Sequence, residues 1–293
     1  MGAIRKWAIS VAQENMIQPK RLILLAAAIL LFCFSIASAQ KASVAISPSS
    51  IEAKVKRGTS YTQTFNLVND TGTRLRFKCS VVDMWYDESN NRVTGRPGTL
   101  ERSASLWVQF SPAEIIVEAH RTGSVNAVVT VPQTAAGGYY SVPVFEVMPA
   151  DPVLADATLA KVSTAKAAIG LRFNGLMMFT TLDASEYNVE IMGGRVTPPG
   201  ASTEMTIELD VLNRSTAHVN LRGAFAILSS TGVLVGRGDI PSKRYLPGQR
   251  NVIEGGWAGE LAPGTYTSVI TLSYDRVGIG SATIVHELPL VVQ

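Results

Sequence analysis

Residues 61–68 read Tyr-Thr-Gln-Thr-Phe-Asn-Leu-Val, and residues 205–211 read Met-Thr-Ile-Glu-Leu-Asp-Val. In both stretches apolar side chains alternate with polar ones, which is the pattern of a β-strand with one buried face. Similar runs, separated by Gly, Pro, Asn and Asp, continue from about residue 42 to the C-terminus. No long stretch shows the spacing of an amphipathic helix. The sequence therefore predicts an all-β protein built from two tandem β-sandwich domains.

The two predicted domains share a plan. Each ends one strand at an Asn-x-Ser/Thr sequence, at 69–71 and 213–215, where a short Asn side chain can bond to the turning backbone. Each also places tyrosine near the start of a late strand, at 139–140 and at Tyr266, as immunoglobulin-like sandwiches often do. We predict immunoglobulin-like domains over 42–173 and 176–293, with the boundary near Phe173-Asn174-Gly175.

Residues 1–39 have the features of a signal peptide. Lys20 and Arg21 precede a mostly apolar run at 22–36, and the small residues Ala37-Ser38-Ala39 follow it. A permanent transmembrane helix needs about 20 apolar residues, so this run is short for one. The alternative is an uncleaved N-terminal anchor. We expect a periplasmic or secreted protein that meets the membrane only during export.

Charge and cysteine content restrict the possible functions. The chain has a formal net charge of +3, but basic and acidic side chains are equal in number once residues 1–39 are removed. No basic stripe remains, so nucleic acid is not an expected partner. Cys79 is the only cysteine left after cleavage, and alternation points it the same way as Leu75 and Phe77. We predict a buried side chain; the alternative is a redox or intermolecular thiol.

The sequence contains no pattern typical of catalysis. The three histidines, His120, His218 and His286, are scattered and lack the spacing of a zinc site. There is no nucleophile elbow and no phosphate-binding loop. The polar residues at 87–91 lack the ligand periodicity of a calcium loop and are predicted to form a hairpin turn. We expect a binding protein, with no enzymatic activity, no metal and no small-molecule cofactor.

Four stretches, taken in order, resemble the N-terminal domain of the periplasmic pilus-assembly chaperones, the PapD-like family. They lie at 46–58, at 65–69 with 81–85, at 107–117, and at 140–147 followed after a long loop by 163–173. The resemblance implies an immunoglobulin-like fold and a role in assembling secreted or pilus subunits by pairing with an open strand edge. It also implies a pair of basic residues, in an inter-domain cleft, that holds the partner's C-terminal carboxylate.

The strand at 163–173 is therefore the expected partner-binding site. Lys166 lies two residues from the family's basic position at Ala168, and Ile169 and Leu171 are the expected apolar anchors. The other basic position falls near Ser50, which is not basic. This departure and the long second domain favour an alternative function, an extracellular or cell-surface structural or adhesion protein. The expected partners are secreted subunits or other surface proteins.

We predict that the exported protein begins at Gln40, because the Ala37-Ser38-Ala39 sequence suits signal peptidase. N-terminal sequencing of protein recovered after export checks this. Retention of Met1 or Met16 in the exported protein would contradict it.

Overall fold

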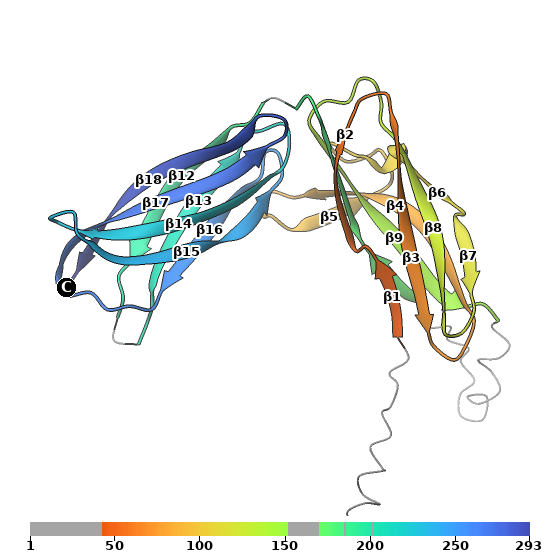
Figure 1. Ribbon diagram of the computed structural model, residues 1–293, viewed down its shortest axis with the longest axis horizontal. Helices are drawn as coiled ribbons and strands as arrows, with labels where there is room; N and C mark the ends of the chain where they lie inside the picture. Colours follow the sequence, from red (N-terminus) through yellow and green to blue (C-terminus); the bar gives the residue numbers. More distant parts are fainter. Residues whose placement is uncertain (1–42, 152–169, 185, 201) are drawn as a thin grey trace, which may run out of the picture. The chain divides into compact units, whose positions relative to one another are not determined.

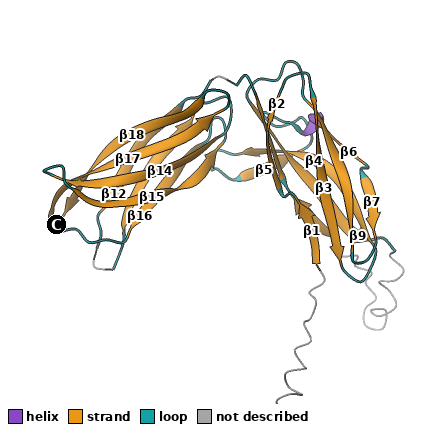
Figure 2. Cartoon of the chain, viewed as in Figure 1, coloured by secondary structure: helices purple, strands orange, loops and turns teal. Residues whose placement is uncertain are grey.

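Alternating apolar and polar side chains form strands throughout the described part of the chain. The computed structural model describes residues 43–151, 170–184, 186–200 and 202–293 (Figures 1 and 2). The predicted signal peptide at 1–39 lies outside these residues. Within them, no helix is long and apolar enough to span a membrane. Residues Ser43–Gln293 form one compact unit that contains both sandwiches.

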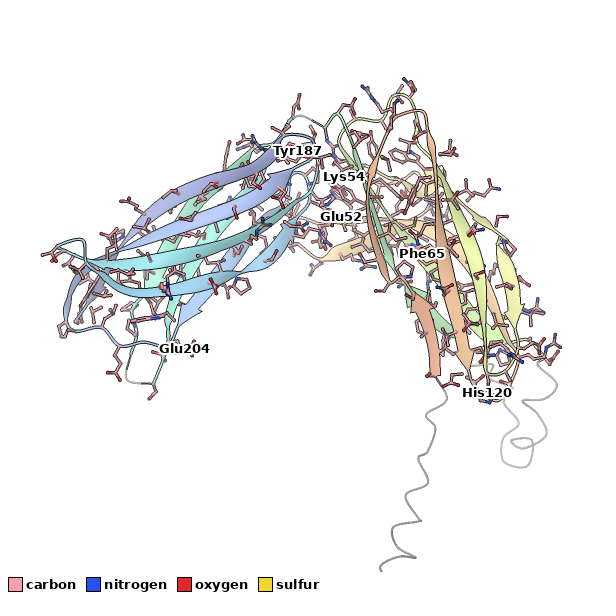
Figure 3. The ribbon with its side chains drawn as sticks, in the orientation of Figure 1. Glu52, Lys54, Phe65, His120, Tyr187 and Glu204 are labelled. Atoms are coloured by element: carbon pink, nitrogen blue, oxygen red, sulfur yellow. The ribbon has the colours of Figure 1, made fainter. Side chains whose placement is uncertain are left out.

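The first sandwich consists of a four-stranded and a seven-stranded sheet. The smaller sheet has the order β1 (Ser43–Ser47), β3 (Ser60–Asp70), β8 (Arg121–Thr130), β6 (Val108–Ser111). The larger has the order β2 (Ser50–Val55), β11 (Leu176–Thr181), β9 (Gly138–Pro149), β4 (Leu75–Tyr86), β5 (Arg92–Gly95), while β7 (Glu114–Val117) pairs with β4 and β10 (Leu171–Asn174) with β9. A 3-10 turn, η1 (Ser105–Trp107), precedes β6. The core holds Phe65, which is labelled in Figure 3. Its ring centroid lies 5.1 Å from that of Phe145.

The second sandwich has a three-stranded and a four-stranded sheet. The first has the order β12 (Val189–Thr197), β13 (Met205–Asn213), β16 (Arg250–Trp257), and the second the order β15 (Leu234–Tyr245), β14 (Val219–Ser229), β17 (Gly264–Arg276), β18 (Gly280–Val292). Along β13, Ile207, Leu209 and Val211 are fully buried, as the alternation at 205–211 predicts. The predicted fold class, two tandem β-sandwiches, is confirmed.

The passage from one sandwich to the next lies later than the sequence indicates. β11, placed by the sequence at the start of the second domain, pairs in parallel with β2 and antiparallel with β9. Its side chains Met177 and Phe179 are fully buried in the first core. β11 therefore completes the first sandwich, and the chain crosses to the second between Thr181 and Val189.

The repeated Asn-x-Ser/Thr sequence performs the same task in both sandwiches. Asn69 and Asn213 are fully buried, and each side-chain oxygen accepts the N–H two residues later, from Thr71 and Ser215. The Asn213 amide donates to the carbonyls of Ala217 and Tyr245, both at 3.0 Å. The Asn69 amide likewise donates to the Thr73 carbonyl in the turn at 2.8 Å and to the Val117 carbonyl of β7 at 2.9 Å. Each Asn thus closes a strand end whose buried carbonyls would otherwise lack donors.

Two of the tyrosines near the start of late strands bond to nearby backbone groups. The Tyr266 hydroxyl donates to the Ala262 carbonyl at 2.8 Å, as in the tyrosine corner of immunoglobulin-like domains. The Tyr139 hydroxyl accepts the Ala136 N–H at 3.2 Å.

Replacing Asn213 or Asn69 by Ala should lower the free energy of unfolding by about 2–4 kcal/mol, because buried carbonyls lose their donors. The control is Asn126→Ala, at an exposed position on β8, which should change it by less than about 0.5 kcal/mol. Urea unfolding followed by circular dichroism measures the difference. Equal effects of the Asn213 and Asn126 substitutions would contradict the assigned role.

Candidate partner-binding site

The last part of the first sandwich is an extended segment that runs along β9 and is divided into β10 and β11. β10 pairs with β9 alone, whereas β11 also pairs with β2 on its other side. β10 pairs with β9 from Leu171↔Val147 to Asn174↔Val144, and β11 continues along β9 from Met177↔Ser141. Of the predicted anchors, the structure places Leu171 at the start of β10. Lys166 and Ile169 lie outside the described residues, so their role stays a prediction.

Gly175 makes the transition between β10 and β11 possible. Its N–H donates to the Pro143 carbonyl at 2.9 Å. A Cβ at this position would lie 2.8 Å from Cγ of Pro143 and 3.0 Å from the Ser49 carbonyl oxygen, so a larger residue requires a shift of the backbone. Gly175 is therefore a point of close approach inside a sheet, and not a linker residue.

The hydrogen bonds at Gly175 and Leu176 fix the direction of the backbone groups. The Gly175 N–H points to β9, whereas the Leu176 N–H donates to the Ser49 carbonyl on the other side at 3.0 Å. Because successive residues of a strand point their N–H and C=O to opposite sides, Arg172 and Asn174 direct theirs away from β9. β2 begins at Ser50, opposite Leu176, and no described strand pairs with that side of β10. β10 therefore presents an open edge.

The two faces of this edge differ in polarity. Phe173 is half-buried against the first core, while Leu171, on the same face, keeps 48% of its surface exposed. On the opposite face Arg172 is exposed and lies across from Glu146 of β9. An extended segment laid along β10 would meet an apolar side chain on one face and a charged one on the other.

A polar network that links the two sandwiches is a second element of the site. Glu52 of β2 contacts His218 Nε2 at 3.0 Å and the Arg244 guanidinium at 3.4 Å. The backbone N–H of His218 donates to the buried Tyr140 hydroxyl at 2.8 Å. Sequence reasoning missed this network, because its members are distant in the chain and match no motif.

The electrostatics of this network follow from its contacts. The hydrogen bond from His218 holds the pKa of the Glu52 carboxyl below its usual range, with partial burial opposing the shift and the charges of His218 and Arg244 adding to it. Burial raises the pKa of the Tyr140 hydroxyl well above its usual range, so it stays neutral. The network thus joins an ionised carboxylate to a neutral phenol through one imidazole.

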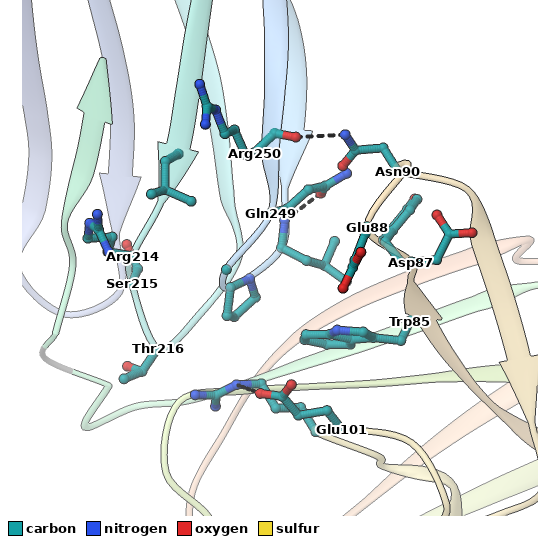
Figure 4. A pocket seen from close by; sticks show the side chains of 16 residues that line it. Trp85, Asp87, Glu88, Asn90, Glu101, Arg214, Ser215, Thr216, Gln249 and Arg250 are labelled. Atoms are coloured by element: carbon teal, nitrogen blue, oxygen red, sulfur yellow. Dashed lines mark hydrogen bonds and ion pairs between the residues drawn. The ribbon is translucent and has the colours of Figure 1, made fainter. Parts of the chain in front are cut away.

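A cavity of about 850 Å³ lies next to the network (Figure 4). Its walls come from the β4–β5 hairpin, the loop before η1, and the loops at 212–216 and 246–250. Trp85 and Arg102 line it from the first sandwich, and the Asn90 amide donates to the Arg250 carbonyl across it at 2.7 Å. The predicted polar hairpin turn is present, because the Asp87 carboxylate accepts the N–H groups of residues 89 and 91.

The loop that carries Arg102 is held by a buried carboxylate. Asp83 accepts the N–H groups of residues 98–100 and the Ser103 hydroxyl. Desolvation acts to raise the pKa of this carboxyl, but these hydrogen bonds outweigh it and the pKa lies below its usual range. Arg102 has φ of 49°, and its buried Nε finds no hydrogen-bond partner among the described residues. The cavity wall therefore contains a guanidinium whose Nε lies 4.0 Å from the Glu101 carboxylate and makes no hydrogen bond to a described residue.

These surfaces are suited to binding. Among the described residues, no three His, Cys, Asp or Glu side chains are grouped so that they could hold a metal. Cys79 is buried in the first core, as predicted, and burial raises the pKa of its thiol to about 11. A thiol with this pKa is a poor nucleophile at neutral pH. The features described for this site are the unpaired side of β10, the Glu52–His218–Tyr140 network and the cavity beside Trp85.

No family model matches the chain, and no curated protein matches it. Solved structures do. The class 5 fimbriae chaperone CfaA is 12% identical, with 85% of this chain and 100% of its own covered and a TM-score of 0.47. The E. coli chaperone DraB is 10% identical, covering 84% and 99%, with a TM-score of 0.40. A chain of the CsuC–CsuE chaperone–tip adhesion subunit complex of Acinetobacter baumannii is 12% identical, covering 83% and 98%, with a TM-score of 0.40.

These solved structures are fimbrial chaperones or complexes that contain one.

Glu52→Gln should lower stability at pH 7 by about 0.5–1 kcal/mol, a value reduced by solvent screening because the side chain is half-exposed. The folded pKa lies below the unfolded value of about 4.3, so the carboxylate stabilises the fold above that pH. This contribution is lost as the pH falls through the folded pKa. The difference between wild type and variant in urea unfolding should therefore shrink as the pH is lowered from about 5 to about 2.

The matched control is Glu254→Gln, at an exposed position on β16, which should change stability at pH 7 by less than about 0.5 kcal/mol. If wild type and Glu52→Gln differ in stability by the same amount at about pH 5 and at about pH 2, the ionised Glu52 carboxylate is not the cause of the difference.

Proposed function

We propose that this chain is an exported, chaperone-like binding protein that holds extended segments of secreted or pilus subunits by strand addition at β10. One observation carries the proposal. Arg172 and Asn174 direct their backbone N–H and C=O groups to a side on which no described strand pairs with β10. An added strand would satisfy these groups and extend the larger sheet.

Side chains along the edge would select the partner. Leu171 is an exposed apolar group on the core-facing side of β10, so an apolar partner side chain next to it would be buried between the sheets. Ile169 would extend this apolar row by one position. Lys166 would contact a partner carboxylate, and such a charge-assisted hydrogen bond contributes about 1.5–3 kcal/mol. No step of this function requires catalysis or a cofactor.

Arg172→Pro tests the strand-addition model. The substitution removes a donor that points to the open edge and leaves the hydrogen bonds to β9 intact, so the domain should still fold. Capture of exported proteins from the periplasmic or secreted fraction of the source cells by the tagged mature chain should fall at least about tenfold. Quantitative mass spectrometry of the captured proteins gives the readout.

Arg172→Ala is the matched control, since it removes the same side chain but keeps the backbone donor. It should retain capture within about threefold, a change of less than 1 kcal/mol. If the Pro and Ala variants capture partners equally well, strand addition at β10 is excluded. The structural or adhesion function then becomes the better interpretation.

A further inference from the structure

The three arginines that line the cavity beside Trp85 each have a carboxylate of the same chain close by. Arg214 Nε donates to Glu190 at 2.7 Å, and Arg250 Nε donates to Asp210 at 2.9 Å. The Nε of the third, Arg102, is buried and lies 4.0 Å from a carboxylate oxygen. The chain itself thus neutralises most of the positive charge in this cavity.

Three carboxylates line the same cavity. Asp87 is engaged by the backbone of its own hairpin turn. Glu88 is exposed, and the ion pairs found among the described residues do not include it, while Glu101 keeps 70% of its side chain exposed. Counted with Glu190 and Asp210, five carboxylates stand against three guanidinium groups. The cavity therefore has an excess of negative charge, which favours a cationic ligand.

An aromatic wall lies beside the two exposed carboxylates. In the view of Figure 4 the Glu88 and Glu101 side chains lie on opposite sides of the Trp85 indole. The Trp85 ring centroid is 5.6 Å from that of the buried Tyr140, a contact that holds the indole in place. The electron-rich face of an indole attracts cations, and it does so most strongly where water is partly excluded.

We infer that this cavity binds an arginine side chain of a partner polypeptide, with its guanidinium against Trp85 and its N–H groups directed to Glu88 and Glu101. A guanidinium is planar, always charged and less strongly hydrated than an ammonium group, so it can stack on an indole while it donates to carboxylates. The cavity, at about 850 Å³, has room for the stretch of peptide that carries the side chain. β10 takes no part in this site.

A pair of peptides tests the ligand chemistry. The probe is the acetylated and amidated peptide Gly-Gly-Arg-Gly-Gly, and its control has citrulline, an uncharged group of the same shape, in place of arginine. The indole N–H signal of Trp85 in the NMR spectrum of the mature chain, assigned by its loss in Trp85→Phe, gives the readout. The arginine peptide should shift this signal with a Kd of about 10 mM or lower, and the citrulline peptide should bind at least about tenfold more weakly.

L-Argininamide distinguishes a polypeptide from a small guanidinium compound as the source of the cation. It should bind at least about threefold more weakly than the arginine peptide, because it lacks the flanking backbone. Equal or tighter binding of L-argininamide would overturn the assignment to a polypeptide.

Charge variants test the residues. Replacing Glu88 and Glu101 together by Gln should raise the Kd of the arginine peptide at least about tenfold. The matched control is Glu260→Gln, at an exposed position in the loop after β16, which should leave this Kd unchanged. Amide spectra confirm that each variant is folded.

Three outcomes would overturn the inference: a Trp85 signal that does not move at about 50 mM arginine peptide, equal binding of the citrulline peptide, or equal Kd values in the charge variant and its control. Arg172→Pro, which acts on β10, leaves this Kd unchanged whether or not partner capture is lost.

Discussion

Backbone hydrogen bonding at sheet edges is the constraint on which this structure depends. Each strand has two sides, and every N–H and C=O on a side must be paired with another strand or with water. In the described chain most edges are short or irregular, so few groups remain open in a row. β10, although only four residues long, and β18 are two described strands with an unpaired side. β10 is open because its neighbour β2 begins only at Ser50, and β18 because it has regular pairing on one side alone.

A different principle joins the two sandwiches. The Glu52, His218 and Tyr140 contacts are polar, and two of the three groups are almost completely removed from solvent. Polar contacts of this kind depend strongly on distance and direction, so they favour one arrangement over many that an apolar contact would permit. Met84 and Leu246 add an apolar cluster beside them. The polar network thus favours one arrangement of the two sandwiches, and the apolar cluster adds buried apolar side chains.

Local patterns in the sequence predicted local structure well. The alternation at 205–211, the buried Cys79 and the turn-closing Asn residues depend on neighbours a few positions away, so sequence reasoning found them. The β11 assignment failed because its partner β2 lies more than 100 residues earlier, and Gly175 resembles a linker glycine in sequence. The open edge of β10 and the His218–Glu52 contact depend on the same kind of long-range pairing, which no motif encodes. Of the predicted anchors, Leu171 is exposed at the start of the open edge, while Lys166 and Ile169 lie outside the described residues.

The position of β11 has a consequence for how the protein is made. The last strand of the first sandwich, in chain order, is an interior strand of its larger sheet, between β2 and β9. A chain that is synthesised from its N-terminus cannot complete that sheet until Thr181 has been added. Until then β2 and β9 lack their common neighbour, and long-range pairing of this kind is intrinsically slow. The first sandwich can therefore close only late in synthesis, and an incomplete chain leaves unpaired strand edges that favour association with other chains.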